Sequence, residues 1–165
     1  MKPHDASDVT CRSVMDTDPV VLAPDTTVAA AVQSLLDNRL LAMPVVDAQG
    51  NYLGVFRKNL VISGVLPQVA THDDRFSQIA RMIDAGLLTD TLHDVRARFD
   101  LIAQDPVGLH VDKEAPVLHP DQSLVAALFY IYRGRNFLPV VDRSNGRLLG
   151  VISAWHVLES MVTKS

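Results

Sequence analysis

The sequence predicts a mixed α/β fold of the α+β kind, in which one strand–helix–strand–strand–helix unit occurs twice. Three observations support this: an internal repeat, hairpin signals within each copy, and helical apolar stripes around them. Three motifs return in the same order, VVLAPD as PVLHPD, MPVVD as LPVVD, and LGVF as LGVI. The first copies begin at Val20, Met43 and Leu53, and the second copies begin at Pro116, Leu138 and Leu149. Motifs repeated in a fixed order indicate repeated structural units, so we expect two similar halves.

A capped helix is expected after the first strand of each half. Thr27 and Ser123 stand where the apolar pattern becomes helical, and a hydroxyl there accepts a hydrogen bond from a free backbone N–H. The apolar stripes that follow are Val28, Ala31, Val32, Leu35 and Leu36 in the first copy, and Leu124, Ala127, Leu128 and Ile131 in the second.

A β-hairpin should follow each of these helices. Short runs rich in β-branched and aromatic residues flank Gly50-Asn51 in the first copy and Asn145-Gly146 in the second, and such dipeptides are typical of tight turns. Proline opens the first strand of each hairpin, where a sheet tolerates the missing N–H. We expect a final helix after each hairpin, over residues 59–65 and 154–162.

These elements divide the chain into an N-terminal tail (1–13), a first repeat (14–66), a helical insert (67–109) and a second repeat (110–163). Residues 14–163 together would form one module. The insert contains two helical stripes, one ending before Gly86 and one before Pro106. The stripes are Phe76, Ile79, Ala80 and Ile83, then Leu92, Val95, Phe99 and Ile102. These faces either pack on the repeats of the same chain or form a surface for a dimer or another partner.

Composition excludes several classes of protein. The 165-residue chain is 48% hydrophobic, which suits one compact domain, and its formal net charge of -4 provides no basic surface for nucleic acid. No apolar run reaches the ~20 residues that a membrane-spanning helix requires. The single cysteine, Cys11, cannot form an internal disulfide, and the first residues lack a signal-peptide pattern. We expect a cytoplasmic protein with no nucleic-acid and no membrane partner.

The sequence presents no catalytic or metal-binding motif. None of its histidines forms the helical pair with a neighbouring acid that metalloproteases use, and His72-Asp73-Asp74 is interpreted as a solvated turn. Gly-x-Ser-x-Gly, the phosphate-binding P-loop and the dinucleotide fingerprint are all absent. We therefore predict no catalytic residues, no metal ligands and no required cofactor, and interpret the protein as a non-enzyme.

The ordered set of motifs resembles the cystathionine-beta-synthase (CBS) repeat, which occurs in tandem as a Bateman module. The resemblance covers residues 14–66 and 110–162. It implies two repeats that pair sheet to sheet about a pseudo two-fold axis and leave two clefts between them. It also implies an adenosine-containing ligand, with AMP, ADP, ATP and S-adenosylmethionine as candidates. Occupancy would be passed to a separate regulated protein or through a homodimer.

In ligand-binding members of this family, the last strand and helix carry Gly, two hydrophobic residues, Thr or Ser, two further residues and Asp. The second copy reads GVISAWH, so Ser153 matches the hydroxyl and His156 replaces the Asp. A helix N-terminus favours phosphate, but a neutral imidazole cannot accept both ribose hydroxyls as a carboxylate does. Arg135 and Asn136 lie in the stretch that resembles the cleft lining, where arginine meets phosphate. A simple helix cap would equally explain Ser153, and an exposed loop would explain Arg135.

The first copy departs further from the family pattern. Arg57 occupies the hydroxyl position, Lys58 follows it, and Leu60 occupies the acid position. A cation at a helix N-terminus is unfavourable unless an anion or a carboxylate offsets it, so phosphate near Arg57 and Lys58 is one interpretation. Extension of both side chains into water is the other. The remaining candidates would contact an adenine ring, although strand core also explains them: Val20, Val21, Pro116 and Val117.

Two hypotheses of function remain. In the first, the chain is a regulatory module that senses a nucleotide between its repeats. In the second, the clefts are degenerate and the chain is a dimerisation or docking module that acts through the insert helices. We take the first as the main hypothesis and the second as the alternative, whose best support is the missing acids at Leu60 and His156.

Overall fold

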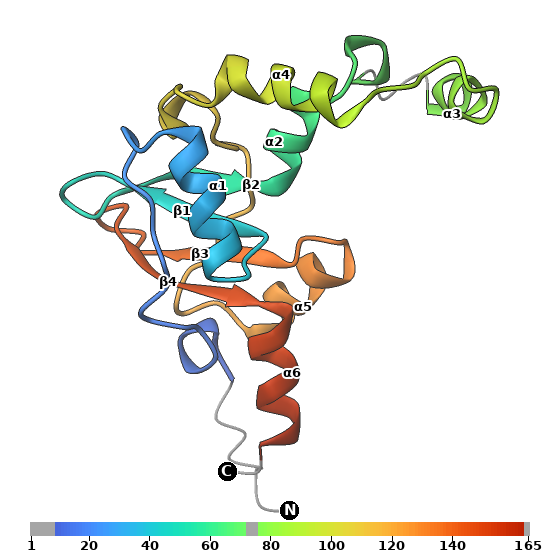
Figure 1. Ribbon diagram of the computed structural model, residues 1–165. Helices are drawn as coiled ribbons and strands as arrows, with labels where there is room; N and C mark the ends of the chain where they lie inside the picture. The colour runs from blue at the N-terminus through green and yellow to red at the C-terminus, as the bar shows by residue number, and fades with distance from the viewer. Residues whose placement is uncertain (1–8, 72–75, 164–165) are drawn as a thin grey trace, which may run out of the picture.

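The structure is a computed structural model that describes residues 9–71 and 76–163. It contains two small antiparallel sheets, each a single hairpin, with helices packed around them (Figure 1). This arrangement confirms the predicted mixed α/β fold. The helices are α1 (Val28–Asp37), α2 (Lys58–Val65), α3 (Phe76–Asp84), α4 (Leu92–Ile102), α5 (Leu124–Tyr132) and α6 (Ala154–Val162). The strands are β1 (Ala42–Val46), β2 (Tyr52–Arg57), β3 (Phe137–Val141) and β4 (Leu148–Ser153).

The first strand expected in each repeat is reduced to one bridged residue. Leu22 lies parallel to β1, donating to Pro44 O (2.9 Å) and accepting from Val46 N (3.0 Å). Leu118 makes the equivalent pair of bonds with β3. Prolines at positions 19, 24, 116 and 120 flank these residues, and because proline has no backbone N–H, the ladder does not extend.

The caps and turns of the two halves follow the sequence closely. The Thr27 hydroxyl accepts from Ala30 N at the start of α1, and the Ser123 hydroxyl accepts from Val125 N at the start of α5. Both hairpins contain an irregularity at the same place, after Val45 and after Val140. Gly50 and Gly146 have positive φ angles of 84° and 72° in the turns, a conformation that glycine adopts without strain.

Each repeat has its own hydrophobic core between its hairpin and its helices. The first core contains Leu22, Val28, Ala31, Leu35, Met43, Val45, Phe56 and Val107. The second contains Cys11, Leu118, Ala127, Leu138, Val140, Ile152 and Val157. One residue of each core comes from the segment that precedes the other repeat. Val107, in the first core, lies just before repeat 2, and Cys11, in the second core, lies in the expected N-terminal tail before repeat 1. The segment that leads into each repeat is therefore anchored in the core of the other repeat.

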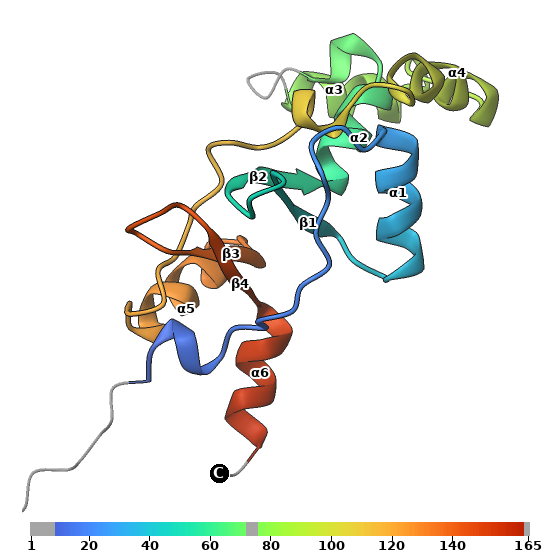
Figure 2. The same ribbon diagram turned by 90° about the vertical axis from the view of Figure 1, so that its left-hand side faces the viewer.

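The two hairpins meet at their turns. Tyr52 N donates to Gly146 O (3.0 Å), and Leu148 N donates to Gly50 O (3.1 Å), around a bridge between Asn51 and Arg147. From this contact the hairpins diverge, and α2 and α6 leave them in opposite directions (Figure 2). A small third cluster, which includes Ala42, Val55 and Ala115, lies between the repeats.

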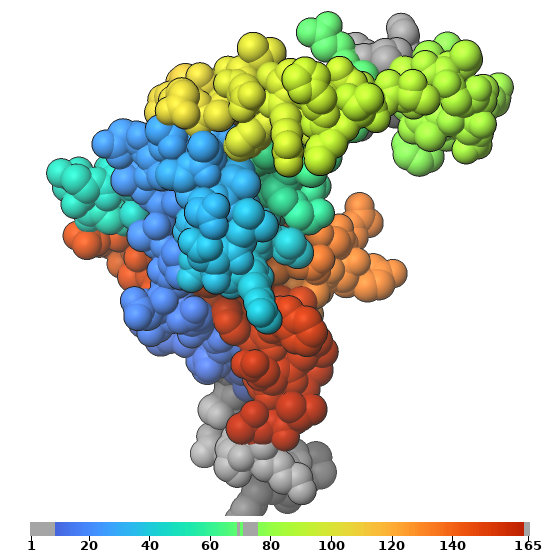
Figure 3. Space-filling model, viewed as in Figure 1, coloured from blue at the N-terminus to red at the C-terminus, as the bar shows by residue number. Residues whose placement is uncertain are grey.

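The insert forms the two helices that its sequence predicts. Helix α4 packs against α2, where Arg98 Nε donates to Val65 O (2.6 Å) and a Cβ on Gly64 would come within 2.9 Å of Ile102. Helix α3 extends away from the rest of the molecule (Figure 3). One insert helix thus packs on the same chain, and the other presents Phe76, Ile83 and the following Leu87 to solvent.

Candidate functional site

Two crossing segments, one on each repeat, define the candidate sites. Residues 13–21 pass along β4, where Asp16 and Val151 exchange both backbone hydrogen bonds (2.9 Å each). Residues 111–117 pass along β2, where Asp112 and Val55 do the same (2.9 and 3.1 Å). Each strand then leads into a helix, α6 or α2. We call the first region, which contains the start of α6, the Ser153 side, and the second, which contains the start of α2, the Arg57 side.

A glycine in each Leu-Gly-Val motif makes room for the crossing segment. A Cβ on Gly150 would overlap the backbone carbonyl of Asp16. A Cβ on Gly54 would lie 3.0 Å from the Val111 side chain and 3.1 Å from the Asp112 carbonyl, and Gly54 also has a φ of 150°. Both motifs therefore carry glycine because backbone passes directly against them.

On the Ser153 side, Ser153 and His156 form a reciprocal cap at the start of α6. The Ser153 hydroxyl accepts from His156 N (3.4 Å), and His156 Nδ1 accepts from Ser153 N (3.1 Å). The His156 ring thus fills the role that an acidic or amide side chain has in a capping box. Because Nδ1 is the acceptor, the proton of the neutral ring is on Nε2. His156 therefore retains one hydrogen-bond donor for another group.

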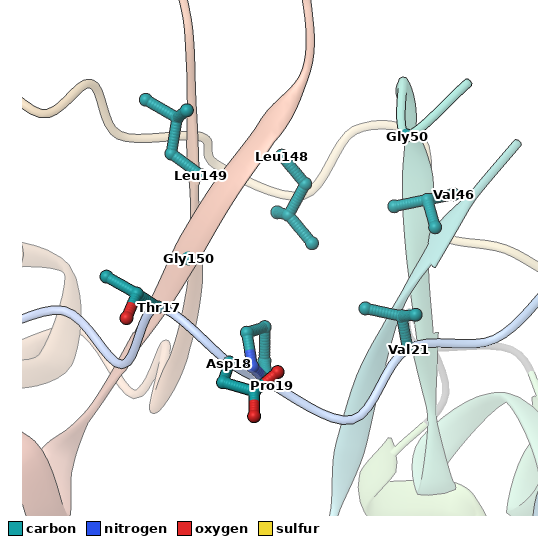
Figure 4. A pocket seen from close by; sticks show the side chains of 9 residues that line it. All are labelled: Thr17, Asp18, Pro19, Val21, Val46, Gly50, Leu148, Leu149 and Gly150. Carbon is teal, nitrogen blue, oxygen red and sulfur yellow. The ribbon is translucent and has the colours of Figure 1, made fainter.

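Two hollows flank the crossing segment on this side. One, of about 390 Å³, is lined by Ser13, Val14, Met15 and Asp16 and by four residues of or just after α6, which are His156, Glu159, Ser160 and Thr163. The other, of about 240 Å³, lies between the repeats (Figure 4). In Figure 4 the side chains of Val21, Val46 and Leu148 converge on it from the crossing segment, β1 and β4. Both hollows combine residues of the two repeats.

On the Arg57 side, a cation and a carboxylate of the chain pair with each other. Arg57 Nε lies 3.3 Å from Asp112 Oδ2, and the two side chains are 17% and 25% exposed. The Arg57 Nε atom makes this ion pair without hydrogen-bond geometry, and the buried Arg57 Nη2 atom and Tyr52 hydroxyl also have no hydrogen-bond partner. Burial raises the pKa of Tyr52 to about 12, an effect that Arg57 opposes and Asp112 reinforces. The carboxylate of Asp112 therefore supplies the negative charge that Arg57 requires at the start of α2.

The predicted site residues separate into these two regions. Val21 lines the inter-repeat hollow on the Ser153 side, with Val20 next to it on the crossing segment, and both are partly exposed. Phe137 pairs with Ser153 across the hairpin, so Asn136 and Arg135, both exposed, precede β3 at the same end. The Arg57 side contains the remaining candidates: Arg57, exposed Lys58, and half-buried Pro116 and Val117. The structure does not bring all ten residues into one cleft.

Three residues of these regions were not predicted from the sequence. Asp16 and Asp112 occupy equivalent positions in the two crossing segments, and Tyr52 lies beside the Arg57–Asp112 pair. The clue available in the sequence was the unbalanced cation at the start of α2, which implies a nearby anion or carboxylate. Local patterns do not identify which carboxylate, because Asp112 is far from Arg57 along the chain.

Comparison with known protein families explains the duplicated architecture. The family model described as CBS domain matches residues 11–65 and 107–163. The chain belongs to the CBS-domain family. The two matches begin at Cys11 and Val107, the residues through which each CBS repeat contributes to the core of the other.

Solved structures of CBS-domain proteins share this fold. A CBS-domain protein of unknown function from Kribbella flavida is 24% identical, with a TM-score of 0.62, and the match covers 94% of this chain and 99% of that one. CBSX2 from Arabidopsis thaliana is 19% identical, with a TM-score of 0.69 and coverage of 94% and 96%. CbpB in complex with c-di-AMP is 17% identical, with a TM-score of 0.60 and coverage of 93% and 85%. CBSX2 has also been solved in complex with AMP. No curated protein matches this sequence.

The described part of the CBS pair contains neither a cluster of metal ligands nor a membrane-spanning helix. Within residues 9–71 and 76–163, no group of three or more His, Cys, Asp and Glu side chains is arranged to hold a metal ion. His72-Asp73-Asp74 lies outside the described residues. None of the helices in the described part of the chain is long and apolar enough to span a membrane.

Proposed function

We propose that this CBS pair is a cytoplasmic regulatory module, not an enzyme, that binds an adenosine-containing nucleotide on its Ser153 side. One observation carries the proposal: the crossing segment from repeat 1 lies directly along β4 of repeat 2, next to the start of α6. A ligand there would contact both repeats at once. Because a ligand shifts only an equilibrium between states that it contacts differently, a site shared by two repeats is suited to signalling.

The ligands of similar structures support the class of compound. CBSX2 was crystallised with AMP and CbpB with c-di-AMP, and both ligands contain adenosine and phosphate. The Ser153 side has groups suited to both parts. Val20 and Val21 are apolar and partly exposed, which suits the face of a purine ring. The start of α6 favours an anion, and exposed Arg135 provides a cation at the same end of the hairpin.

His156 sets a preference within this class of ligand. Its Nδ1 already accepts from Ser153 N, so the neutral ring offers only the Nε2 donor to a ligand. A donor pairs with a phosphate or ring oxygen and cannot accept from two ribose hydroxyls. We therefore expect recognition of the phosphate to contribute more than recognition of the ribose.

The Arg57 side is proposed to remain empty. The guanidinium of Arg57 is already paired with Asp112. A phosphate would have to displace the largely buried carboxylate of Asp112 before it could bind Arg57. Separating such a pair without replacement is costly, because a charge is left in a poorly solvated place. We expect one nucleotide per chain.

The test is calorimetry of the full chain with AMP, ADP, ATP, S-adenosylmethionine and c-di-AMP. At least one should bind with a stoichiometry near one per chain. Ser153→Ala should weaken that binding by at least tenfold, equivalent to ~1.4 kcal/mol. Ser123→Ala is the matched control, because Ser123 caps α5 and belongs to neither side. No binding of any compound at millimolar concentration, or two equal sites per chain, would contradict the proposal.

The docking function remains the second candidate because of two observations. The inter-repeat hollow, at about 240 Å³, is smaller than the roughly 300–1,000 Å³ typical of a ligand site, and the other hollow, at about 390 Å³, is near the lower end of that range. Helix α3 also projects an apolar surface that includes Phe76, which is 80% exposed. Phe76→Asp separates the two functions: loss of partner binding with nucleotide binding intact would favour docking. Phe76 is a better choice than Ile79 or Phe99, because these two are buried or packed on the first core.

A further inference from the structure

The Ser153 side is acidic. Its crossing segment, residues 13–21, contributes Asp16 and Asp18, and α6 contributes Glu159. Neither that segment nor α6 contains a lysine or an arginine. Asp16 and Glu159 line one of the two hollows, and Asp18 lines the other (Figure 4). Each hollow on this side therefore has a carboxylate in its wall and neither lysine nor arginine.

The Arg57 side has the opposite balance of charge. The end of β2 and the start of α2 contribute Arg57 and Lys58, and the crossing segment there contributes Lys113. These three cations outnumber the two carboxylates of the same segment, which are Asp112 and Glu114. Because both sides are built by the same backbone crossing, the difference in charge comes from the side chains alone. The acidic character is thus a property of the Ser153 side and not of the shared architecture.

The carboxylates of Asp16 and Glu159 are not neutralised by cations of the chain. Among residues 9–71 and 76–163, neither forms an ion pair. Asp16 Oδ1 accepts only the neutral backbone donor Asp18 N (3.0 Å), and Asp16 itself is half-buried. Partial burial reduces the screening of a charge by water, whereas Glu159 is exposed and is screened more strongly. Both carboxylates therefore act on a charged group that enters the hollow, and Asp16 should act the more strongly.

A second or third phosphate finds no favourable place on this side. The start of α6 and Arg135 can stabilise one phosphate. A further phosphate in the hollow beside His156 would lie next to Asp16 and Glu159, which share that hollow. Two like unit charges about 4 Å apart weaken an interaction roughly fivefold even in bulk water. A phosphate that extends into solvent instead makes no contact that would offset this repulsion.

We infer that the Ser153 side selects adenosine nucleotides with a single phosphate over nucleoside di- and triphosphates, and that Asp16 and Glu159 determine this specificity. The inference rests on the proposed function, because it concerns the ligand of the same site. It adds the number of phosphates that the site accepts and the residues that set it. Because the repulsion grows with the charge of the phosphate chain, affinity should fall stepwise from AMP to ADP to ATP.

Calorimetry of the full chain with AMP, ADP and ATP tests the inference, in a buffer without magnesium so that the phosphates keep their charge. The wild type should bind AMP at least ~10-fold more tightly than ATP, with ADP between them. Asp16→Asn and Glu159→Gln should each reduce this ratio at least ~3-fold. Asparagine retains an oxygen that can accept from Asp18 N, and glutamine has the shape of glutamate. Circular dichroism checks that both variants are folded.

Glu114→Gln is the matched control for Glu159→Gln. Both substitutions remove one negative charge from an exposed glutamate, but Glu114 lies on the crossing segment of the Arg57 side. The control should therefore leave the ratio of AMP to ATP affinity at the wild-type value. An equal change in the two variants would show that net charge of the protein, and not the position of Glu159, sets the preference, and would overturn the inference.

Ionic strength distinguishes repulsion from simple lack of space. Raising salt from about 0.1 M to about 1 M shortens the Debye length from ~10 Å to ~3 Å, so the ratio of AMP to ATP affinity should fall toward one. ATP that binds as tightly as AMP, or a ratio that neither salt nor the two variants change, would overturn the inference and leave the proposed function intact. Failure of AMP itself to bind would overturn it too, and the proposed function falls only if every other compound of its panel also fails.

Discussion

The Ser153 side and the Arg57 side are built by the same backbone crossing but have different chemistry. An aspartate stands at the same place in both crossing segments, Asp16 in one and Asp112 in the other. Opposite Asp112, Arg57 forms an ion pair and α2 begins without a side-chain cap. On the other side, Ser153 caps α6, and the Asp16 carboxylate accepts from Asp18 N instead (3.0 Å). The side chain at the start of each helix, Arg57 or Ser153, is therefore one clear difference between the two related regions.

The largest expected loss of stability comes from a substitution that blocks the backbone crossing on the Ser153 side. Gly150→Ala places a Cβ against the Asp16 carbonyl, and neither backbone has room to move without breaking the shared hydrogen bonds. We expect a loss of about 3 kcal/mol in the free energy of unfolding, together with loss of nucleotide binding. Denaturant unfolding measures the first and calorimetry the second.

Gly86→Ala is the control for this substitution. A Cβ at Gly86 meets nothing within 4 Å, so only its positive φ of 68° opposes the change. That strain costs ~1–2 kcal/mol, and nucleotide binding should be unchanged. Equal destabilisation of the two variants would show that the close approach at Gly150 is not important.

A smaller effect is expected from removing the carboxylate on the Arg57 side. Asp112→Ala leaves a largely buried guanidinium without its counter-charge, which should cost about 2 kcal/mol. Phosphate or sulfate should recover part of this loss by taking the place of the carboxylate, and should stabilise the variant more than the wild type. Thermal unfolding with and without each anion measures the difference.

Asp121→Ala serves as the comparison for Asp112→Ala. Asp121 pairs with Arg143 at 3.6 Å, but both side chains are well exposed. Exposed ion pairs contribute about 0–1 kcal/mol, so this variant should behave like the wild type with and without anions. If phosphate and sulfate stabilise Asp112→Ala no more than they stabilise the wild type, the Asp112 carboxylate does not occupy a position that a free anion can take.

The smallest effect concerns the hairpin turns, where the two repeats are alike. Hydrogen bonds from Asn51 lower the pKa of Asp47, and hydrogen bonds from Ser144 lower the pKa of Asp142. A carboxyl whose pKa is lower in the folded state contributes stability at neutral pH and loses it as the pH falls through the folded pKa. Unfolding of the wild type should therefore become easier below about pH 4, near the ordinary carboxyl value. Asp47→Asn should show a weaker dependence in the same urea titrations, and an identical dependence would exclude this role for Asp47.

The sequence predicted the elements of this fold well because they depend on local signals. The stripes after Thr27, Ser123 and Thr91 all became helices with side-chain caps, and both predicted turns lie between paired strands. The first strands were expected to be longer, and the flanking prolines explain why they are not. Local signals are sufficient where the hydrogen-bond partners lie a few residues apart.

The candidate sites were harder to predict because they depend on contacts between distant residues. Nothing near Arg57 in the sequence identifies Asp112 as its partner, and nothing near Asp16 identifies Val151. The sequence does not show which of the ten predicted site residues lie together, and the structure places them on two sides. One signal of such a contact is present in the sequence: a glycine in the interior of a strand indicates a close backbone approach, as at Gly150.

The exchange of leading segments also constrains how the chain folds. Cys11 completes the core of repeat 2, and Val107 completes the core of repeat 1. Residues 10–16 can therefore complete their native backbone pairing only after residue 151 has been synthesised, although they are synthesised well before it. Such non-local pairing slows folding, because the entropy of closing a long loop must be overcome before the contacts form. We therefore expect the pair to be the cooperative folding unit, because an isolated repeat lacks one residue of its core.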